Sequence, residues 1–432
     1  MSDKRLLIRG GTVIDPSEKL NEKREKREKR DILIEDGVIK EIGTSIDAGD
    51  ALVFEAEGML VFPGLIDMHT HLREPGGEES ETVQTGCDAA AAGGFTAVCP
   101  MPNTKPTTDD PGRIRYILEC AIGAKARVYP VGALTVGRDG EDITEMAAMT
   151  EAGAVAFSDD GCSVNDAEIM RHALRYANMI GKPVIGHEED SSLDRDGQMN
   201  ESSLSAELGL RGMPSIAEEI MTLRDLAIAE YTNTAFHVTH ISTRGTIDII
   251  RAAKARGVQV TCDVTPHHLT LNEELLATYD TRYKMSPPLR SQDDVEAMRE
   301  GLKDGAIDAI ATDHAPHSLE LKMREFLYAP FGVTGLETAL SVIQKELVDT
   351  GIISWERVIE SLSTAPARIL GVEGGTLAKG SIGDVAIYDP KDSWKVEPKK
   401  MKSRSGNTCY FNWEMPGRVQ ATVVGGVLYR NE

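Results

Sequence analysis

Two histidines and an arginine stand close together in the stretch Val61–Glu74, which reads VFPGLIDMHTHLRE. His69 and His71 follow an apolar run and are two residues apart, and residues i and i+2 of a β-strand lie on the same face. Both imidazoles can therefore bind one metal ion. Arg73 comes two residues later, and a guanidinium beside a metal can hold a substrate carboxylate while the reacting carbonyl lies over the ion. We interpret this stretch as part of a metal-dependent active site.

The elements that must position these residues form a repeated pattern. Short apolar or β-branched runs alternate with segments rich in Ala, Leu, Glu and Arg that have helical character. The eight runs are Val61–His69, Phe95–Met101, Arg127–Leu134, Ala154–Asp159, Pro183–His187, Ala235–Ile241, Gln259–Val264 and Ile307–Asp313. Strand alternating with helix eight times predicts an α/β fold, a closed (β/α)8 TIM-type barrel. A doubly wound sheet stays an alternative, because periodicity does not prove closure.

Polar residues cluster where the predicted strands end. They are His69, His71 and Arg73 after the first strand, Asn103 after the second, Asp159 and Asp160 after the fourth, His187 after the fifth, His240 after the sixth, and Asp313 and His317 after the eighth. Active sites of such barrels lie at the carboxyl ends of the strands, so we expect these side chains to share one site. The other five histidines, to which we assign no direct function, are His172, His237, His267, His268 and His314.

Composition narrows the class of protein. The chain has 432 residues, enough for a barrel of about 250 residues and a smaller unit. The formal charge of −22 argues against nucleic acid or an anionic membrane as a partner. The six cysteines include no CxxC pair, and the N-terminus lacks an apolar signal segment, so we expect a reduced, cytoplasmic protein. No apolar run approaches the length of a membrane span. The charged repeat EKREKREKR is expected to be exposed to solvent, and we assign it no function.

Six motifs in order carry a family resemblance. They read HLREPG, GGFTAVCPMPNT, AFSDDG, HVTHIST, ATDHAPH and APFGVTGLET. Together they resemble the dihydroorotases of the long, bacterial-type class, within the amidohydrolase superfamily. The similarity covers essentially the whole chain, and GTLAKGSIGDVAIYDP and VVGGVLY resemble the strands that complete the family's small β domain. The implied division is a small β domain from residues 1–60 and 371–432, with the barrel over residues 61–370.

The resemblance implies a centre of two zinc ions per chain. The implied ligands are His69, His71, Asp160, His187, His240 and Asp313. Many amidohydrolases bridge their metals with a carboxylated lysine after strand four, but this strand ends in Ser158, Asp159 and Asp160. The resemblance selects Asp160 as the bridge, with Asp159 as the second candidate. Such ions lower the pKa of water to about 7 and polarise a carbonyl, which supports amide hydrolysis or its reverse, with Asp313 also carrying the proton.

The resemblance also implies how the substrate is held. The implied contacts are Arg73, Asn103 and His317 to a carboxylate, with Ser286, Phe331 and Gly332 lining the rest of the site. Ser286, in KMSPPLR, stands where dihydroorotases commonly have Asn, and a serine there is more typical of allantoinases.

Three functions stay open at this point. The first is dihydroorotase, which interconverts N-carbamoyl-L-aspartate and L-dihydroorotate in de novo pyrimidine (UMP) biosynthesis. The second is a related cyclic amidase, an allantoinase or hydantoinase, and the third is an inert scaffold subunit. The full ligand set argues against the scaffold. The partner is a small-molecule substrate, while a homodimer and an association with aspartate transcarbamoylase stay open.

Overall fold

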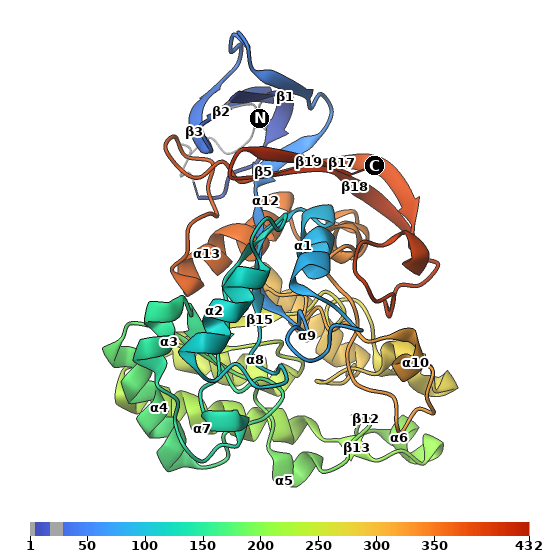
Figure 1. The fold of residues 1–432 in the computed structure, drawn as a ribbon. Helices are drawn as coiled ribbons and strands as arrows, with labels where there is room; N and C mark the ends of the chain where they lie inside the picture. Colours follow the sequence, from blue (N-terminus) through green and yellow to red (C-terminus); the bar gives the residue numbers. More distant parts are fainter. Residues whose placement is uncertain (1–4, 18–28, 432) are drawn as a thin grey trace.

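The computed structural model describes residues 5–17 and 29–431. It contains parallel strands ringed by helices, together with a separate eight-stranded sheet that holds strands from both ends of the chain and that we call the small sheet, after the expected small β domain (Figure 1). The repeat EKREKREKR lies largely outside the described residues, so its expected conformation stays a prediction.

The barrel strands follow the predicted runs. They are β6 (Leu65–Thr70), β7 (Phe95–Pro100), β8 (Arg127–Val128), β9 (Val131–Gly132), β10 (Ala156–Phe157), β11 (Val184–Gly186), β14 (Phe236–Val238), β15 (Val260–Val264) and β16 (Ala309–Ile310). One parallel set runs β6, β7, β8, and the other runs β9, β10, β11, β14, β15, β16. The ring closes where Thr70 pairs in parallel with His314, whose carbonyl accepts from the His71 N–H over 2.8 Å. This closure confirms the (β/α)8 barrel, and the doubly wound alternative is wrong.

Two predicted runs are divided in the structure. The run Arg127–Leu134 contains Pro130, which has no N–H to donate to a ladder, so β8 pairs with β7 while β9 pairs with β10. The run Val61–His69 is not one strand, which corrects our prediction: β5 (Leu60–Pro63) belongs to the small sheet and β6 to the barrel. Between them a Cβ on Gly64 would lie 2.3 Å from the Thr96 side chain, so only glycine fits at this crossing.

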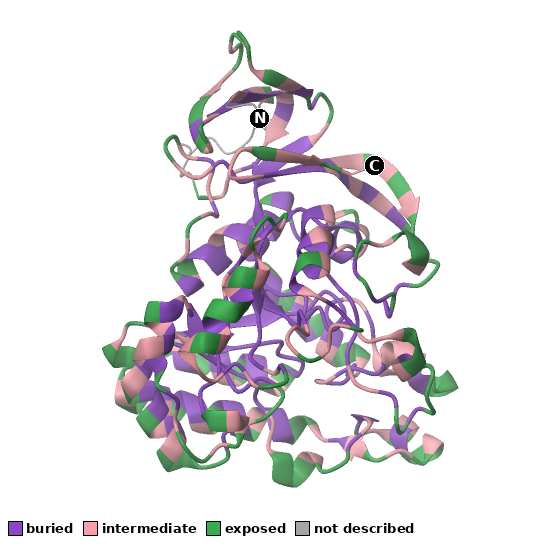
Figure 2. Ribbon diagram, in the orientation of Figure 1, coloured by how far each residue is buried: buried purple, intermediate pink, exposed green. Residues whose placement is uncertain are grey.

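Helices cover the outside of the barrel with their buried residues turned inward (Figure 2), and most of the apolar ones among these belong to the main hydrophobic cluster. These helices are α1 (Val83–Ala92), α2 (Pro111–Cys120), α3 (Met146–Ala152), α4 (Ala167–Met179), α7 (Ser215–Thr232), α8 (Arg244–Ala255), α9 (Gln292–Asp304), α11 (Ala339–Ile343), α12 (Trp355–Ile359) and α13 (Ala365–Leu370). In α8, Thr243 caps the N-terminus, and Ile247 and Ile250 lie on the buried face. No helix in the described ranges is long and apolar enough to cross a membrane.

Short elements fill the long connections between the barrel strands and their helices. These elements are α5 (Ser191–Asp194), β12 (Met199–Asn200), α6 (Ser203–Leu208), β13 (Gly212–Met213) and α10 (Leu319–Lys322). In the view of Figure 1, α5, α6, β12 and β13 lie at the lower edge of the molecule, away from the small sheet, and α10 lies above them at the right.

The small sheet joins strands from both ends of the chain. Its strands are β1 (Arg5–Val13), β2 (Lys29–Glu35), β3 (Val38–Gly43), β4 (Leu52–Glu55), β5, β17 (Val385–Lys395), β18 (Glu414–Val424) and β19 (Val427–Arg430). The antiparallel pair of β5 with β17 connects the N-terminal and C-terminal parts. A small β domain from both ends is therefore present, while the division at residues 60 and 370 stays a prediction.

Candidate metal centre and substrate cavity

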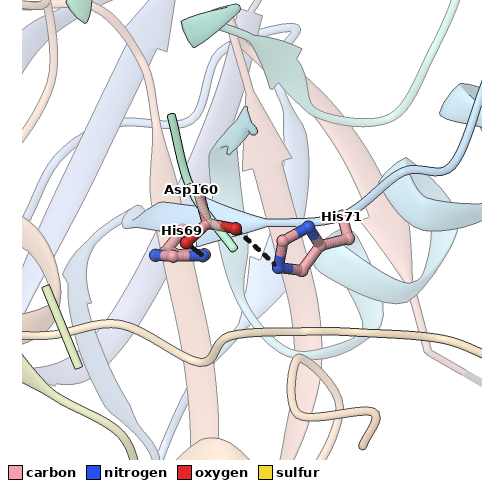
Figure 3. Close-up of side chains that lie close together, drawn as sticks. All are labelled: His69, His71 and Asp160. Atoms are coloured by element: carbon pink, nitrogen blue, oxygen red, sulfur yellow. Dashed lines mark ion pairs between the residues drawn. The ribbon is translucent and has the colours of Figure 1, made fainter. Parts of the chain in front are cut away.

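The two histidines of the HxH pair face a shared aspartate. His69 lies in β6, His71 directly after it, and Asp160 after β10. The Nε2 atom of His69 is 3.2 Å from Oδ1 of Asp160, and the Nε2 atom of His71 is 3.7 Å from Oδ2 (Figure 3). All three side chains are buried, and their ligand atoms are close enough to bind one metal ion.

The same aspartate faces a second pair of histidines. Oδ1 of Asp160 lies 3.6 Å from both the Nδ1 atom of His187 and the Nε2 atom of His240. These histidines follow β11 and β14, and with Asp160 they form a second group of ligand atoms within 4.8 Å of one another. Because both groups share Asp160, its position is the one that a ligand bridging two ions would occupy.

Asp313, after β16, lies beside the first group. Its Oδ1 atom is 2.9 Å from the Nε2 atom of His71 and 3.6 Å from that of His69. Burial alone would raise the pKa of this carboxyl, but the hydrogen bond from His71 and the charge of His69 bring its pKa below the usual range. Asp313 is therefore an ionised carboxylate next to the imidazoles.

Asp159, the second candidate for the bridging ligand, hydrogen-bonds to the loop after β9 instead of facing the histidines. Its Oδ1 atom accepts hydrogen bonds from the backbone N–H groups of Leu134 and Thr135 over 2.8 and 3.0 Å, and its Oδ2 atom accepts one from the Thr135 hydroxyl. These bonds tie the end of β10 to the loop after β9. The geometry therefore leaves Asp160, rather than Asp159, between the histidines.

The donor set fits a pair of zinc ions. Imidazole nitrogen and carboxylate oxygen are ligands that zinc favours. The Nε2 atom of His69 and the Oδ1 atom of Asp160 are both buried, and neither has a hydrogen-bond partner within the part of the chain that the structure describes. Buried polar atoms without partners are costly, and a cation between them would satisfy both.

A second layer of hydrogen bonds, which the sequence did not reveal, orients these ligands. The Nδ1 atom of His69 is 2.8 Å from the Thr239 hydroxyl, which in turn donates to Asp263 over 3.0 Å. The other oxygen of Asp263 accepts from the backbone N–H of His240 over 2.8 Å, and His237 contacts the same carboxylate at 2.8 Å. Asp263 therefore holds a ligand from each group through β15. Such contacts fix which ring nitrogen faces a metal.

Asn103 and Glu189 orient three further expected ligands. The side-chain oxygen of Asn103 is 2.9 Å from the Nδ1 atom of His71, and its amide nitrogen donates to Asp160 over 3.3 Å. Glu189 lies 3.2 Å from the Nε2 atom of His187. Asn103 thus contacts two ligand residues, in addition to the substrate contact that we expect from the sequence.

A cavity of about 360 Å³ opens over this centre. Its lining residues are His71, Arg73, Asn103, Asp160, Gly161, His187, Glu189, Asp194, Met213, His240, Ser286, Asp313, Ala315, His317, Phe331 and Gly332. The cavity therefore brings together all six residues that we expect to bind substrate, and His69 alone among the expected ligands is not part of its lining. Their roles stay predictions.

One side of the cavity is suited to bind an anion. Arg73 donates from Nε to the Pro316 carbonyl over 3.1 Å, and its Nη2 atom lies 3.3 Å from His317. The Nε2 atom of His317 is also 2.7 Å from the Phe331 carbonyl. Burial and the charge of Arg73 lower the pKa of His317 to about 3, so this ring is neutral and Arg73 supplies the positive charge.

Comparison with known proteins gives the family. A family model described as Dihydro-orotase-like matches residues 58–246. A protein named Dihydroorotase from Pelotomaculum thermopropionicum is 49% identical over 422 residues, covering 98% of this chain and 97% of that protein. Another protein of the same name, from Syntrophotalea carbinolica, is 49% identical over 428 residues and covers 99% of both chains. The chain belongs to the dihydroorotase family. As a family member it is a hydrolase of cyclic amides, which confirms the resemblance drawn from the six motifs.

Solved structures support the fold. The L-hydantoinase (dihydropyrimidinase) of Arthrobacter aurescens superimposes with a TM-score of 0.87 at 22% identity, covering 100% of this chain and 96% of that one. The D-hydantoinase of a Thermus species has a TM-score of 0.81 at 26% identity, covering 98% and 94%. The shared architecture extends to other cyclic amidases, whereas the near-full-length relatives at 49% identity favour dihydroorotase over the hydantoinase alternative.

Proposed function

We propose that this chain interconverts N-carbamoyl-L-aspartate and L-dihydroorotate, the cyclisation step of pyrimidine biosynthesis. The observation that carries this proposal is the position of Arg73 and His317 in the same cavity as Asp160, in a chain 49% identical to proteins named Dihydroorotase. A ring that carries a carboxylate as well as its reacting amide matches a cavity that has a cation beside metal ligands.

In this proposal six side chains would bind the two metal ions. His69, His71 and Asp313 would hold one zinc ion, His187 and His240 the other, and Asp160 would bridge them. When bound, the two ions would acidify a water molecule and polarise the scissile carbonyl.

Asp313 would move the proton. Its carboxylate lines the cavity, so it can take a proton from the attacking water and give it to the amide nitrogen as the ring opens. In the cyclising direction the same group takes the proton from the ureido nitrogen of carbamoyl aspartate.

Arg73 would bind the substrate carboxylate, with Asn103 and His317 beside it. Ser286, Phe331 and Gly332 line the remainder of the cavity and would contact the ring. Zinc as the metal and a cytoplasmic location are predictions of the same proposal, while a homodimer and an association with aspartate transcarbamoylase stay open.

Substrate specificity is the sharpest test. Zinc-loaded protein would be offered dihydroorotate, allantoin and hydantoin in parallel, together with the variant Arg73→Met. We expect turnover of dihydroorotate, and we expect Arg73→Met to lose about 2 to 4 kcal/mol of transition-state stabilisation in kcat/KM, because the substrate anion then lies unpaired. Faster turnover of allantoin by the wild type, or unchanged kinetics in Arg73→Met, would contradict the proposal and make Ser286 the better guide.

A further inference from the structure

Two lysines outside the metal centre are almost completely buried. Lys284 is 1% exposed and Lys322 is 4% exposed. A buried ammonium group is costly unless it is paired or fully hydrogen-bonded, so lysine is rare in protein interiors. Neither lysine forms an ion pair with a carboxylate in residues 5–17 or 29–431.

Both ammonium groups instead donate to backbone carbonyls of one segment, residues 326–332, which we call the wall loop. Lys322 donates to the carbonyls of Pro330 and Gly332, each over 3.0 Å. Lys284 donates to the carbonyl of Phe326 over 2.6 Å, and its Nζ lies 4.6 Å from the centre of the Phe331 ring.

The two lysines are also joined to each other and to the rest of the barrel. The Lys284 carbonyl accepts from Lys322 Nζ over 3.3 Å and from the Gly332 N–H over 3.0 Å. Lys284 Nζ also donates to the side chain of Gln198 over 2.6 Å. Lys284 follows β15, Lys322 follows β16 and Gln198 follows β11, so three barrel loops meet at the wall loop.

The wall loop forms part of the substrate cavity. Phe331 and Gly332 line it, and the Phe331 carbonyl contacts His317. From the other side, the Asn407 amide donates to the carbonyls of Gly332 and Ala315, each over 3.1 Å. The wall loop is therefore held through its backbone, and its position depends on side chains that do not line the cavity.

Among the described residues, the carboxylate that acts on the ammonium of Lys322 is that of Asp280. The groups that face it are Lys284, Asp280, the Cys409 thiol and His317. Asp280 also pairs with Arg282, two residues later, over 2.9 Å. Burial raises the pKa of Cys409 to about 12 and lowers that of His317 to about 3, so both are neutral. The wall loop is therefore held by two ammonium groups, neither of which forms an ion pair with a carboxylate among the described residues.

We propose that Lys322 is a positioning residue for substrate binding. Through the carbonyls of Pro330 and Gly332 it fixes the wall of the cavity, and its charge favours an anionic substrate there, while Lys284 holds the start of the same loop. The inference rests on the proposed function for the identity of the anion, but the placement of the loop does not depend on it.

The test compares Lys322→Met with wild type and with Lys303→Met, a control on the exposed surface of α9. We expect KM for dihydroorotate to rise at least about tenfold in Lys322→Met, with kcat changed by less than about threefold and zinc content unchanged. Hydrogen–deuterium exchange should speed up over residues 326–333 and stay unchanged in the barrel strands. Lys303→Met should match wild type in both measurements.

Lys322→Gln provides a second variant if the methionine variant folds poorly. Glutamine keeps N–H donors for the carbonyls but has no charge, so we expect slower exchange than in Lys322→Met and a smaller rise in KM. An unchanged KM together with unchanged exchange would overturn the proposal, as would a loss confined to kcat. If wild type does not turn over dihydroorotate at all, the proposed function fails, and the exchange measurement still decides the role of Lys322.

Discussion

The metal centre and the wall loop are two sides of one cavity that are built in opposite ways. The metal centre consists of side chains at strand ends, with Asp160 within 3.7 Å of four imidazoles. The wall loop presents its backbone and is held from behind by Lys284 and Lys322, whose charges have no carboxylate partner among the described residues.

This difference shows how binding and chemistry are separated. In the proposed function, the charges in the metal centre hold cations and move a proton, so any change in them should alter the reaction itself. Positive charge under the wall loop lies near the expected substrate anion and should mainly alter affinity. Variants in the two regions should therefore fall into different kinetic classes.

The largest effect is expected at the shared aspartate, and the chain offers a matched control next to it. Asp160→Asn leaves one neutral oxygen where two ions need a bridging carboxylate, so we expect metal content to fall from two ions to one or fewer per chain and kcat to fall by about 10³-fold or more. Asp159→Asn keeps the oxygen that accepts from Leu134 and Thr135, and should retain both ions.

Metal analysis by mass spectrometry and steady-state kinetics on both variants would measure this. Loss of metal from Asp159→Asn but not from Asp160→Asn would reverse the assignment. If zinc-replete wild type contained one ion per chain and Asp160→Asn had the same metal content, Asp160 would not be a ligand shared by two ions.

A smaller loss of metal affinity is expected when a residue that orients the ligands, but does not bind the metal itself, is changed. Asp263→Asn removes the negative charge that holds Thr239 and the backbone of His240, without touching the cavity. Loss of such a contact costs about 10- to 100-fold in metal affinity. Competition with a zinc chelator would measure this, and KM for substrate at saturating zinc should not change. Wild-type zinc affinity in this variant would show that Asp263 serves folding alone.

The grouping of the expected metal ligands could be predicted from sequence because each lies at the end of a strand or within three residues after it. His69, His187, His240 and Asp313 stand at the ends of apolar runs, and the closed barrel then brings them together. Resemblance was needed to choose Asp160 over Asp159, since adjacent residues after a strand differ only in the direction of the side chain.

Other features of the structure could not be predicted from the sequence. Asp263 stands within the run QVTCDV, where a polar residue in a strand does not disclose its partner 24 residues earlier. The division at Gly64 depends on the approach of Thr96 from the next strand, and the wall loop depends on backbone carbonyls, which every residue has. Such contacts are set by the packed structure and not by residue type.

The smallest expected effect concerns Lys322 and pH. Burial and the charge of Lys284 lower the pKa of Lys322 to about 7 from an ordinary value of 10.5, while the charge of Asp280 acts in the opposite direction. Between about pH 7 and pH 10.5 the unfolded chain binds more protons at Lys322 than the folded chain does, so the free energy of unfolding rises with pH across this range.

The variant Lys322→Met removes this contribution. We therefore expect the gain in melting temperature from pH 7 to pH 9, measured by calorimetry at saturating zinc, to be smaller in Lys322→Met than in wild type or Lys303→Met. The metal centre titrates alike in all three proteins, so the difference reports the wall loop alone, and equal gains would mean that Lys322 keeps its proton throughout this range.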